Sequence, residues 1–165
     1  MSRAVLLTGG NTPEIDKNIH KVRELINKEL GTIIQTSSIY ESEPWGFQAT
    51  HHFLNQIIII DTRLLPEELL FKIWDIERRF GRSRGTAEEE KLKYQKRLSE
   101  KTPAYKSRTM DIDILFYDSQ IIHTPLLNIP HPLIPFRNFV LIPLKEILPD
   151  FIHPILNKPI KDIDC

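Results

Sequence analysis

Asp111 and Asp113 are the side chains in this sequence best suited to metal chemistry. They alternate with apolar residues in Met110–Phe116, so a strand there would turn Met110, Ile112, Ile114 and Phe116 to one face and both carboxylates to the other. At roughly 3.3 Å per residue, the two Cα atoms would lie about 7 Å apart. Such a pair can bind magnesium, with phosphate oxygens completing the shell. It is equally compatible with the solvent-facing side of an amphipathic strand.

Arginines flank the segment that leads to the aspartates. They are Arg78, Arg79, Arg82, Arg84 and Arg108. A guanidinium group keeps its charge and binds phosphate oxygens through two parallel hydrogen bonds, which suits a polyphosphate ligand. Arg78 and Arg79 also fit the last turn of a helix, where basic residues are favoured, whereas the other three fall in predicted loops.

A histidine between two prolines forms a third cluster. His131 stands between Pro130 and Pro132, with Arg137 and Phe139 a few positions later. The prolines favour an extended backbone, from which the imidazole could donate to a phosphate or leaving-group oxygen. A lone histidine is also common as a packed or surface residue.

Other catalytic motifs are missing from the sequence. It contains neither a P-loop nor a Gly-x-Ser-x-Gly elbow, and residues 9–11 do not form a dinucleotide fingerprint. His51 and His52 have no suitably spaced partners for a metal site, and Cys165 is a poor candidate for a nucleophile. Phosphate binding would therefore depend on side chains.

Length and composition predict one domain, residues 1–165. Lysine plus arginine and aspartate plus glutamate both number 22, so no net charge draws the chain to nucleic acid or membranes. One cysteine, no signal peptide and no apolar stretch of roughly 20 residues favour a cytoplasmic protein. A monomer is the default expectation.

The elements that must position these residues follow from hydrophobic periodicity. We expect an α+β fold with strands over 3–8, 33–40, 53–61 and 109–117 and helices over 13–30 and 66–80. The order β-α-β-β-α-β is typical of a ferredoxin-like antiparallel sheet with its helices on one face. The run of isoleucines at 57–60 predicts a strand buried on both faces.

Three segments lie outside this core. Residues 41–52 are predicted to form a loop, and residues 86–104 form a mostly charged loop insertion. From 125 to 159 the chain has eight of its 12 prolines, which predicts an irregular C-terminal extension with one short helix over 139–148.

The order of motifs resembles the 6-hydroxymethyl-7,8-dihydropterin pyrophosphokinase family over nearly the whole chain. The matching segments are Thr8–Asn11, Ser37–Gly46, Phe53–Gln56, Ile76–Arg82, Arg108–Leu115, Pro130–Pro132, Arg137–Leu141 and Pro143–Leu144. The resemblance implies transfer of pyrophosphate from ATP to the pterin hydroxymethyl oxygen, with release of AMP and help from two magnesium ions.

The resemblance also assigns residues to roles. Asp111 and Asp113 would hold the metal, and the catalytic group would be Arg82, Arg108, Asp111, Asp113 and His131. ATP would be bound by Glu77, Arg82, Arg84, Tyr105, Arg108, Ile114, Asn128, His131 and Arg137, with Leu127 also near the adenine. The family often has tryptophan where this chain has Tyr105. For Glu77, a position on the helix surface is the simpler interpretation.

The pterin side of the site is likewise implied by the resemblance. Phe53 and Phe139 would sandwich the flat ring, although the sequence alone favours ordinary core packing for both phenylalanines and only the resemblance makes them site residues. Asn55 could meet donors and acceptors on the ring edge. The remaining pterin-binding candidates are Ser42, Glu43, Pro44, Trp45 and Asp111.

Two other functions fit parts of the pattern. An RNA-binding module of the RRM type would share the sheet, but the aromatic-rich strand signature is missing and the net charge is zero. A different metal-dependent nucleotidyl or phosphoryl transferase would share the aspartates and arginines. Phe53, Asn55 and Phe139 favour the pterin as acceptor, so the expected partners are ATP and the pterin alone.

Overall fold

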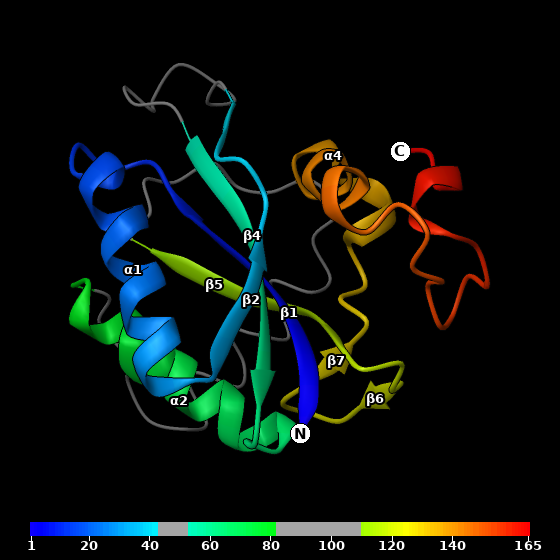
Figure 1. Ribbon diagram of the computed structural model, residues 1–165, viewed down its shortest axis with the longest axis horizontal. Helices are drawn as coiled ribbons and strands as arrows, with labels where there is room; N and C mark the ends of the chain where they lie inside the picture. Colours follow the sequence, from blue (N-terminus) through cyan, green and yellow to red (C-terminus); the bar gives the residue numbers. More distant parts are fainter. Residues whose placement is uncertain (43–52, 82–109) are drawn as a thin grey trace.

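A five-stranded antiparallel sheet forms the centre of the computed structural model, which describes residues 1–42, 53–81 and 110–165 (Figure 1). Its strands are β1 (Ser2–Gly10), β2 (Thr32–Thr36), β3 (Tyr40–Ser42), β4 (Phe53–Thr62) and β5 (Asp111–Tyr117). The order across the sheet is β2-β4-β1-β5, and β3 pairs with the start of β4. Every pairing in the sheet is antiparallel, which confirms an α+β fold with an antiparallel sheet.

Two helices cover one face of the sheet. α1 (Ile15–Glu29) and α2 (Pro66–Arg79) bury apolar residues spaced three or four positions apart, as the sequence predicts. These residues pack with alternate residues of the strands, such as Leu6, Ile58 and Ile60, in one continuous core.

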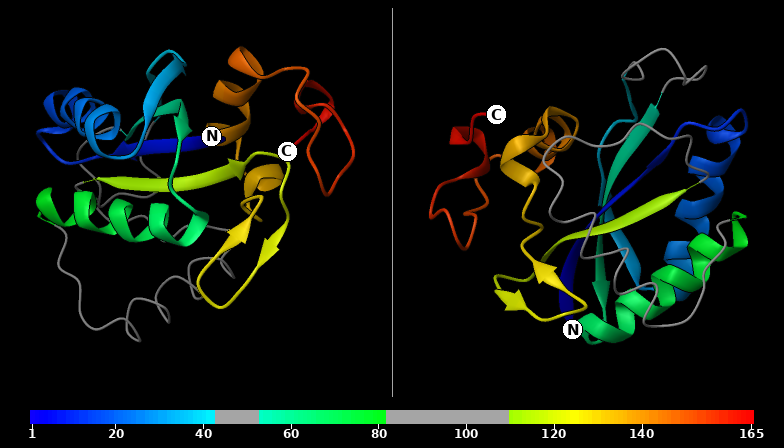
Figure 2. Two further views of the ribbon diagram at one scale, coloured as in Figure 1. Left: turned by 60° about the horizontal axis from the view of Figure 1, so that its bottom comes forward. Right: turned by 180° about the vertical axis from the view of Figure 1, so that it is seen from behind.

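The opposite face is also covered, by a helix of the C-terminal extension that the sequence did not assign to either face. α4 (Asn138–Ile147) packs there with Val5, Leu7, Ile57 and Ile59. Figure 1 and the right-hand view of Figure 2 show α1 and α4 on opposite sides of the sheet. The isoleucines at 57–60 are therefore buried on both faces, as predicted.

The C-terminal part is less irregular than its prolines suggest. α4 confirms the short helix predicted over 139–148, even though Pro143 lies inside it. Around it lie the small hairpin of β6 (Ile122–His123) and β7 (Asn128–Ile129) and the 3-10 turns η1 (Ile134–Phe136) and η2 (Ile160–Asp162).

The single strand predicted over 33–40 is wrong, because the structure divides it into β2 and β3. Between them, the Ser37 hydroxyl accepts a hydrogen bond from the Ile57 N–H (2.9 Å), while Ser38 turns to Glu146 of α4. The serine side chains compete with the ladder for backbone partners, which interrupts the strand.

The alternation predicted along β5 holds from Met110 to Ile114 and then fails at Phe116. A register shift against β1 lets Val5 face Phe116 and Leu6 face Ile114, so Leu115 is an extra residue. Phe116 therefore joins the core beneath α4, not the core beneath α1 and α2.

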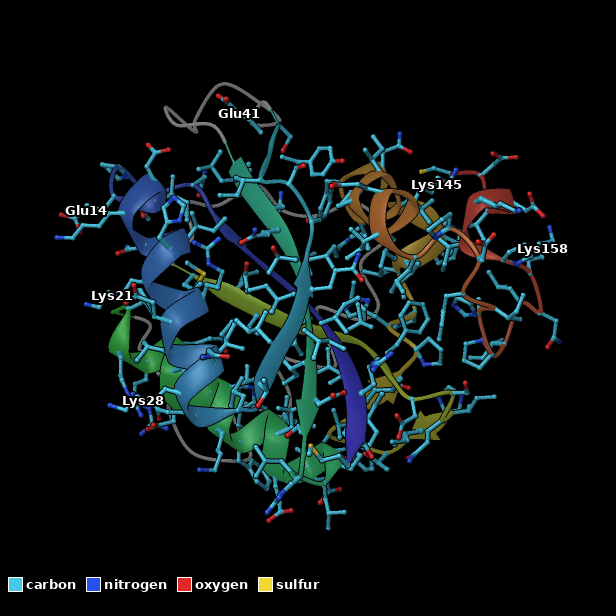
Figure 3. All side chains as sticks on the ribbon, in the orientation of Figure 1. Glu14, Lys21, Lys28, Glu41, Lys145 and Lys158 are labelled. Atoms are coloured by element: carbon cyan, nitrogen blue, oxygen red, sulfur yellow. The ribbon has the colours of Figure 1, made fainter. Side chains whose placement is uncertain are left out.

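Charged side chains project outward from several elements in the view of Figure 3. The labelled ones lie at the start of α1 and along it, in β3, in α4 and near the C-terminus. Among the described residues, no helix combines the length and apolar character needed to cross a membrane.

Candidate active site

Three neighbouring strands place Asn55, Gly9 and Asp111 in one row. Gly9 of β1 lies opposite Asn55 of β4 on one side and opposite Asp111 of β5 on the other. Because residues directly opposite in an antiparallel sheet share a face, Asn55 and Asp111 flank the glycine on the same face. The fold thereby brings together a predicted pterin ligand and a predicted metal ligand.

Gly9 is a residue that the sequence interpretation did not assign to the site. A Cβ atom built there would collide with Asn55 Oδ1 and with the Leu54 carbonyl oxygen. Only glycine therefore lets the Asn55 side chain lie over the central strand. A glycine inside an otherwise buried strand was the available signal for such a close approach.

The next row carries the second aspartate. Asp113 lies opposite Leu7, which in turn lies opposite Ile57, and both apolar residues belong to the core beneath α4. Asp111 and Asp113 are each half-buried. Both carboxylates thus stand on the α4 face of β5, as the alternation predicts.

Two aromatic rings approach this face from different elements. Phe53 is two positions before Asn55 on β4, so the pleat turns it to the same face. Phe139, in the first turn of α4, packs against the core on that face. Ser42 lies opposite Phe53 and brings β3 to the same end of the sheet. The predicted pterin residues within the described part of the chain therefore lie on one face, with Ser42, Phe53, Asn55 and Asp111 at one end of it.

The outer edge of β5 is closed by a buried carboxylate. Glu77 of α2 is only 2% exposed, so the interpretation of this residue as a helix-surface glutamate is wrong. Its Oε2 accepts a hydrogen bond from the Ile112 N–H at 2.9 Å. Within the described part of the chain β5 is an edge strand, so no described strand pairs with this N–H on its outer side, and the carboxylate satisfies it.

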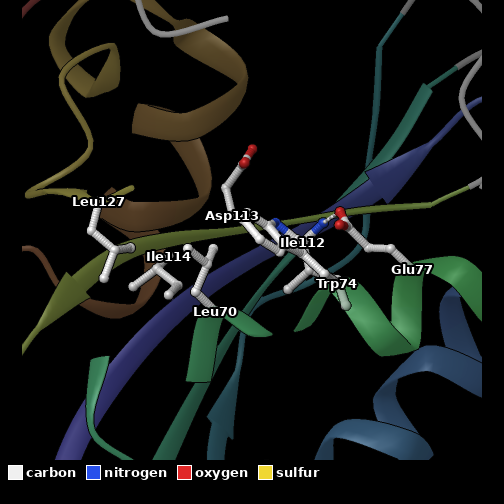
Figure 4. Close-up of a pocket in the computed structure, with 7 residues that line it drawn as sticks. All are labelled: Leu70, Trp74, Glu77, Ile112, Asp113, Ile114 and Leu127. Atoms are coloured by element: carbon white, nitrogen blue, oxygen red, sulfur yellow. Dashed lines mark hydrogen bonds between the residues drawn. The ribbon is translucent and has the colours of Figure 1, made fainter. Parts of the chain in front are cut away.

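A small pocket lies along the same edge (Figure 4). Its lining residues are Leu70, Trp74, Glu77, Ile112, Asp113, Ile114 and Leu127. In the close-up, the Asp113 carboxylate points away from Leu70. Apolar side chains thus adjoin one of the two aspartates. Ile114 and Leu127 were expected near the adenine, whereas Leu70 and Trp74 were not assigned to the site.

His131 is held in place by its surroundings and is 5% exposed. Its backbone N–H donates to the Leu115 carbonyl (3.0 Å), and its Nδ1 accepts from the Leu133 N–H (3.2 Å). An accepting Nδ1 requires the proton of a neutral ring to sit on Nε2. The ring is therefore a hydrogen-bond donor through Nε2.

Arg137 and Phe139 contact each other directly. The Arg137 guanidinium carbon lies 5.4 Å from the centre of the Phe139 ring, within range of a cation–π interaction. The Arg137 carbonyl also accepts the first N–H groups of α4, from Val140 and Leu141. Arg137, a predicted phosphate ligand, and Phe139, a predicted pterin ligand, therefore both lie at the N-terminus of α4.

Asn128, expected near ATP, lies in β7 opposite His123. Its Oδ1 and His123 Nδ1 are 3.0 Å apart, so the imidazole orients the amide. Asn128 directly follows Leu127, which places it beside the pocket at the edge of β5.

Arg79 is turned away from the site. Its guanidinium pairs with Glu29 of α1 and with Asp75 one turn earlier, and these hydrogen bonds raise its pKa above the ordinary value. The interpretation of Arg79 as a basic residue of the last helical turn is therefore confirmed.

Several predicted site residues lie outside the described part of the chain. They are Glu43, Pro44, Trp45, Arg82, Arg84, Tyr105 and Arg108, together with the insertion at 86–104.

The metal-binding potential of the described residues rests on two carboxylates. Among residues 1–42, 53–81 and 110–165, no group of three or more His, Cys, Asp or Glu side chains could hold a metal ion. Asp111 and Asp113 offer hard oxygen ligands two residues apart on one face, which suits magnesium with substrate oxygens as further ligands.

A hydrogen-bonded network at the end of α4 was not foreseen from the sequence. The Glu146 carboxylate accepts hydrogen bonds from Ser38 and Tyr40. The bond with Tyr40 lowers the pKa of Glu146 and raises that of Tyr40.

Comparison with known proteins gives a consistent result. Residues 5–149 match the sequence model of the 7,8-dihydro-6-hydroxymethylpterin-pyrophosphokinase (HPPK) family. The 2-amino-4-hydroxy-6-hydroxymethyldihydropteridine pyrophosphokinase of Aquifex aeolicus is 38% identical over 154 residues, which cover 93% of this chain and 82% of that protein. The enzyme of the same name from Porphyromonas gingivalis is 30% identical, with 96% and 99% covered.

Solved structures support the fold. An HPPK-DHPS protein crystallised in complex with substrates superposes with a TM-score of 0.69 at 17% identity. The match covers 98% of this chain and 42% of that one, so the chain spans about two fifths of the larger protein's length.

Proposed function

The chain belongs to the 7,8-dihydro-6-hydroxymethylpterin-pyrophosphokinase family, and from this membership we propose that it transfers pyrophosphate from ATP to 6-hydroxymethyl-7,8-dihydropterin in folate biosynthesis. The observation that carries the proposal is the gathering of Phe53, Asn55, Asp111 and Phe139 on one face of the sheet. The pterin hydroxymethyl oxygen attacks the β-phosphorus of ATP, the bond between the β-phosphorus and the α–β bridging oxygen breaks, and AMP leaves.

Asp111 and Asp113 hold the metal, for which we expect two magnesium ions. When bound, magnesium neutralises triphosphate charge and orients the attacking and leaving oxygens. The hydrogen bond from Ile112 to buried Glu77 fixes the backbone between the two aspartates, which supports a preorganised pair.

The pterin binds between Phe53 and Phe139, with its edge on Asn55. Offset stacking of this kind contributes about 0.5–1.5 kcal/mol beyond area burial. Gly9 supports this assignment, because it lets Asn55 lie beside Asp111, where the hydroxymethyl group must meet the phosphate chain. Ser42 and the following Glu43, Pro44 and Trp45 complete the ring's surroundings.

The nucleotide lies along the outer edge of β5, with the adenine near Trp74, Ile114 and Leu127. Glu77 and Asn128 border this region. His131 donates to a phosphate oxygen through Nε2, and Arg137 adds its charge. Arg82, Arg84, Tyr105 and Arg108 contribute from the arginine-rich segments on either side of the insertion.

Further properties complete the proposal. The strand order β2-β4-β1-β5 with α1 and α2 on one face supports a ferredoxin-like core, followed by a C-terminal extension. The chain acts as a single domain and a cytoplasmic monomer, with ATP and the pterin as its only partners.

The direct test is to incubate the protein with ATP, magnesium and 6-hydroxymethyl-7,8-dihydropterin and to separate the nucleotide products. We expect AMP in equal amount to pyrophosphorylated pterin. Release of ADP would indicate transfer of a single phosphoryl group, and absence of turnover would contradict the proposal.

A further inference from the structure

One carboxylate joins α4 to the chain between β2 and β3. Glu146 Oε1 accepts hydrogen bonds from the Ser38 N–H (3.0 Å) and the Tyr40 hydroxyl (2.7 Å). Glu146 Oε2 accepts from the Ser38 hydroxyl (3.0 Å). Isolated surface pairs contribute little to stability, but a charged acceptor shared by three donors can hold a particular geometry.

These bonds fix a segment that has little support of its own. Tyr40 begins β3, whose three residues pair with Phe53, Leu54 and Asn55 at the start of β4. A strand this short is marginal without other contacts. Ser37 is tied to β4 by the Ile57 N–H and the Gln56 side chain, so the segment is held between β4 and α4.

The helix that carries Glu146 also carries one wall of the ring-binding space. Phe139 is in the first turn of α4, and Glu146 is in its last turn. Phe53 and Asn55 stand on β4, directly opposite the residues that follow Ser38. Glu146 therefore connects the element bearing one ring to the strands bearing the other.

We propose that Glu146 is a positioning residue that sets the separation between Phe53 and Phe139, and thereby the affinity for the flat pterin ring. The proposal rests on the proposed function, because it assumes that the ring lies between these two side chains. Glu146 touches neither the aspartates nor the pocket at the edge of β5, so its loss should reach the nucleotide only through Arg137 at the start of α4, one of several proposed phosphate ligands.

The test compares Glu146→Ala with the wild type by titrating the dihydropterin in the presence of magnesium and the α,β-methylene analogue of ATP, in which the reacting bond cannot break. We expect the pterin Kd to rise about tenfold, as when an orienting partner of a binding group is removed. The Kd of the analogue should rise clearly less than the Kd of the pterin, because Arg137 is the one proposed phosphate ligand at the start of α4. Tyr40→Phe, a milder change, should shift pterin affinity in the same direction.

Glu29→Ala is the matched control. It also removes a surface carboxylate that accepts hydrogen bonds, in this case from Arg79, but on the opposite face of the sheet. We expect a lower melting temperature with unchanged pterin affinity. If Glu146→Ala binds pterin like the wild type, or weakens pterin and nucleotide equally, the positioning role is wrong.

Two further readouts separate this proposal from the proposed function. Absence of AMP from the wild-type protein would overturn the proposed function itself. Amide hydrogen exchange of residues 38–42, measured without ligands, tests only whether the hydrogen bonds of Glu146 hold this segment in place. Faster exchange in Glu146→Ala is expected, and exchange equal to that of the wild type would overturn the connection whether or not the enzyme turns over.

Discussion

At the scale of single residues, the site depends on one position without a side chain. Gly9 separates Asn55 from Asp111 across three strands, and the space above it is filled by the Asn55 amide. The polar groups proposed to meet the pterin and the metal are thus neighbours in space although 56 positions apart in the chain. Each can be tested by substitutions with matched controls.

Asp113→Ala should abolish most turnover while the fold remains intact, because it removes a metal ligand from a half-buried position on the sheet. We expect kcat to fall by about 10²–10³-fold, the range for loss of one preorganised electrostatic group. AMP release measures the rate, and circular dichroism checks the fold. Asp150→Asn, which alters an exposed carboxylate paired with Lys161, should retain full activity. Near-normal turnover by Asp113→Ala would contradict the metal role.

Gly9→Ala should lower both stability and pterin affinity, because its Cβ would collide with Asn55 and the backbone of Leu54. Overpacking of this kind typically costs about 1–3 kcal/mol. Gly31→Ala is the control, since its Cβ would meet the Asp61 carbonyl far from the site. Denaturant unfolding should show a loss for both variants, and pterin titration a loss for Gly9→Ala alone. Equal pterin affinity in the two variants would argue against the Asn55 assignment.

The sequence predicts the position of some of these side chains but not of others. Period-two alternation was enough to place both aspartates on one face, because it is a local property of a strand. It failed at Phe116, since the extra residue at Leu115 depends on the pairing with β1. The burial of Glu77 was likewise not predictable, because it follows from how α2 lies against the edge of β5.

At the scale of elements, α2 and β5 are joined by the hydrogen bond between Glu77 and Ile112. Glu77→Ala should destabilise the protein by about 1–3 kcal/mol, because a buried backbone N–H loses its acceptor. Glu77→Gln, which keeps a carbonyl oxygen at that place, should lose less. Urea unfolding followed by fluorescence measures both. If the alanine variant unfolds at the wild-type midpoint, the bond does not stabilise the α2–β5 contact.

Helices and strands were predicted well where their apolar pattern is regular, as in α1, α2 and β4. The division between β2 and β3 was missed because Ser37 and Ser38 find partners in β4 and α4, which local sequence does not reveal. The position of α4 opposite α1 was missed for the same reason. The isoleucines at 57–60 of β4 indicated that both faces of the sheet are buried, but they did not show which element packs on the second face.

At the scale of the whole molecule, the C-terminal segment makes stability depend on pH through His153. The ring is 4% exposed, lies edge-on to Phe116, and accepts the Ile155 and Leu156 N–H groups through Nδ1. Burial lowers its pKa below the ordinary value of 6.5. As pH falls below about 6.5, the unfolded chain takes up a proton before the folded one does, so stability decreases.

We therefore expect the melting temperature to fall between pH 7 and pH 5, and to fall less in His153→Gln. The difference between variant and wild type isolates this histidine from the others. Parallel pH profiles for the two proteins would show that His153 does not contribute.

The central place of β1 has a consequence for how the chain folds during synthesis. At the N-terminal end of this strand the Arg3 N–H donates to Asp118 Oδ1, just after β5, and the two residues are 115 positions apart. β1 therefore leaves the ribosome long before β5 can pair with it. Until then its apolar faces and one row of backbone groups lack their final neighbour, a state open to pairing with other chains. The aspartates arrive with that last strand. A nascent chain therefore cannot assemble its metal-binding row before the core of the sheet is complete.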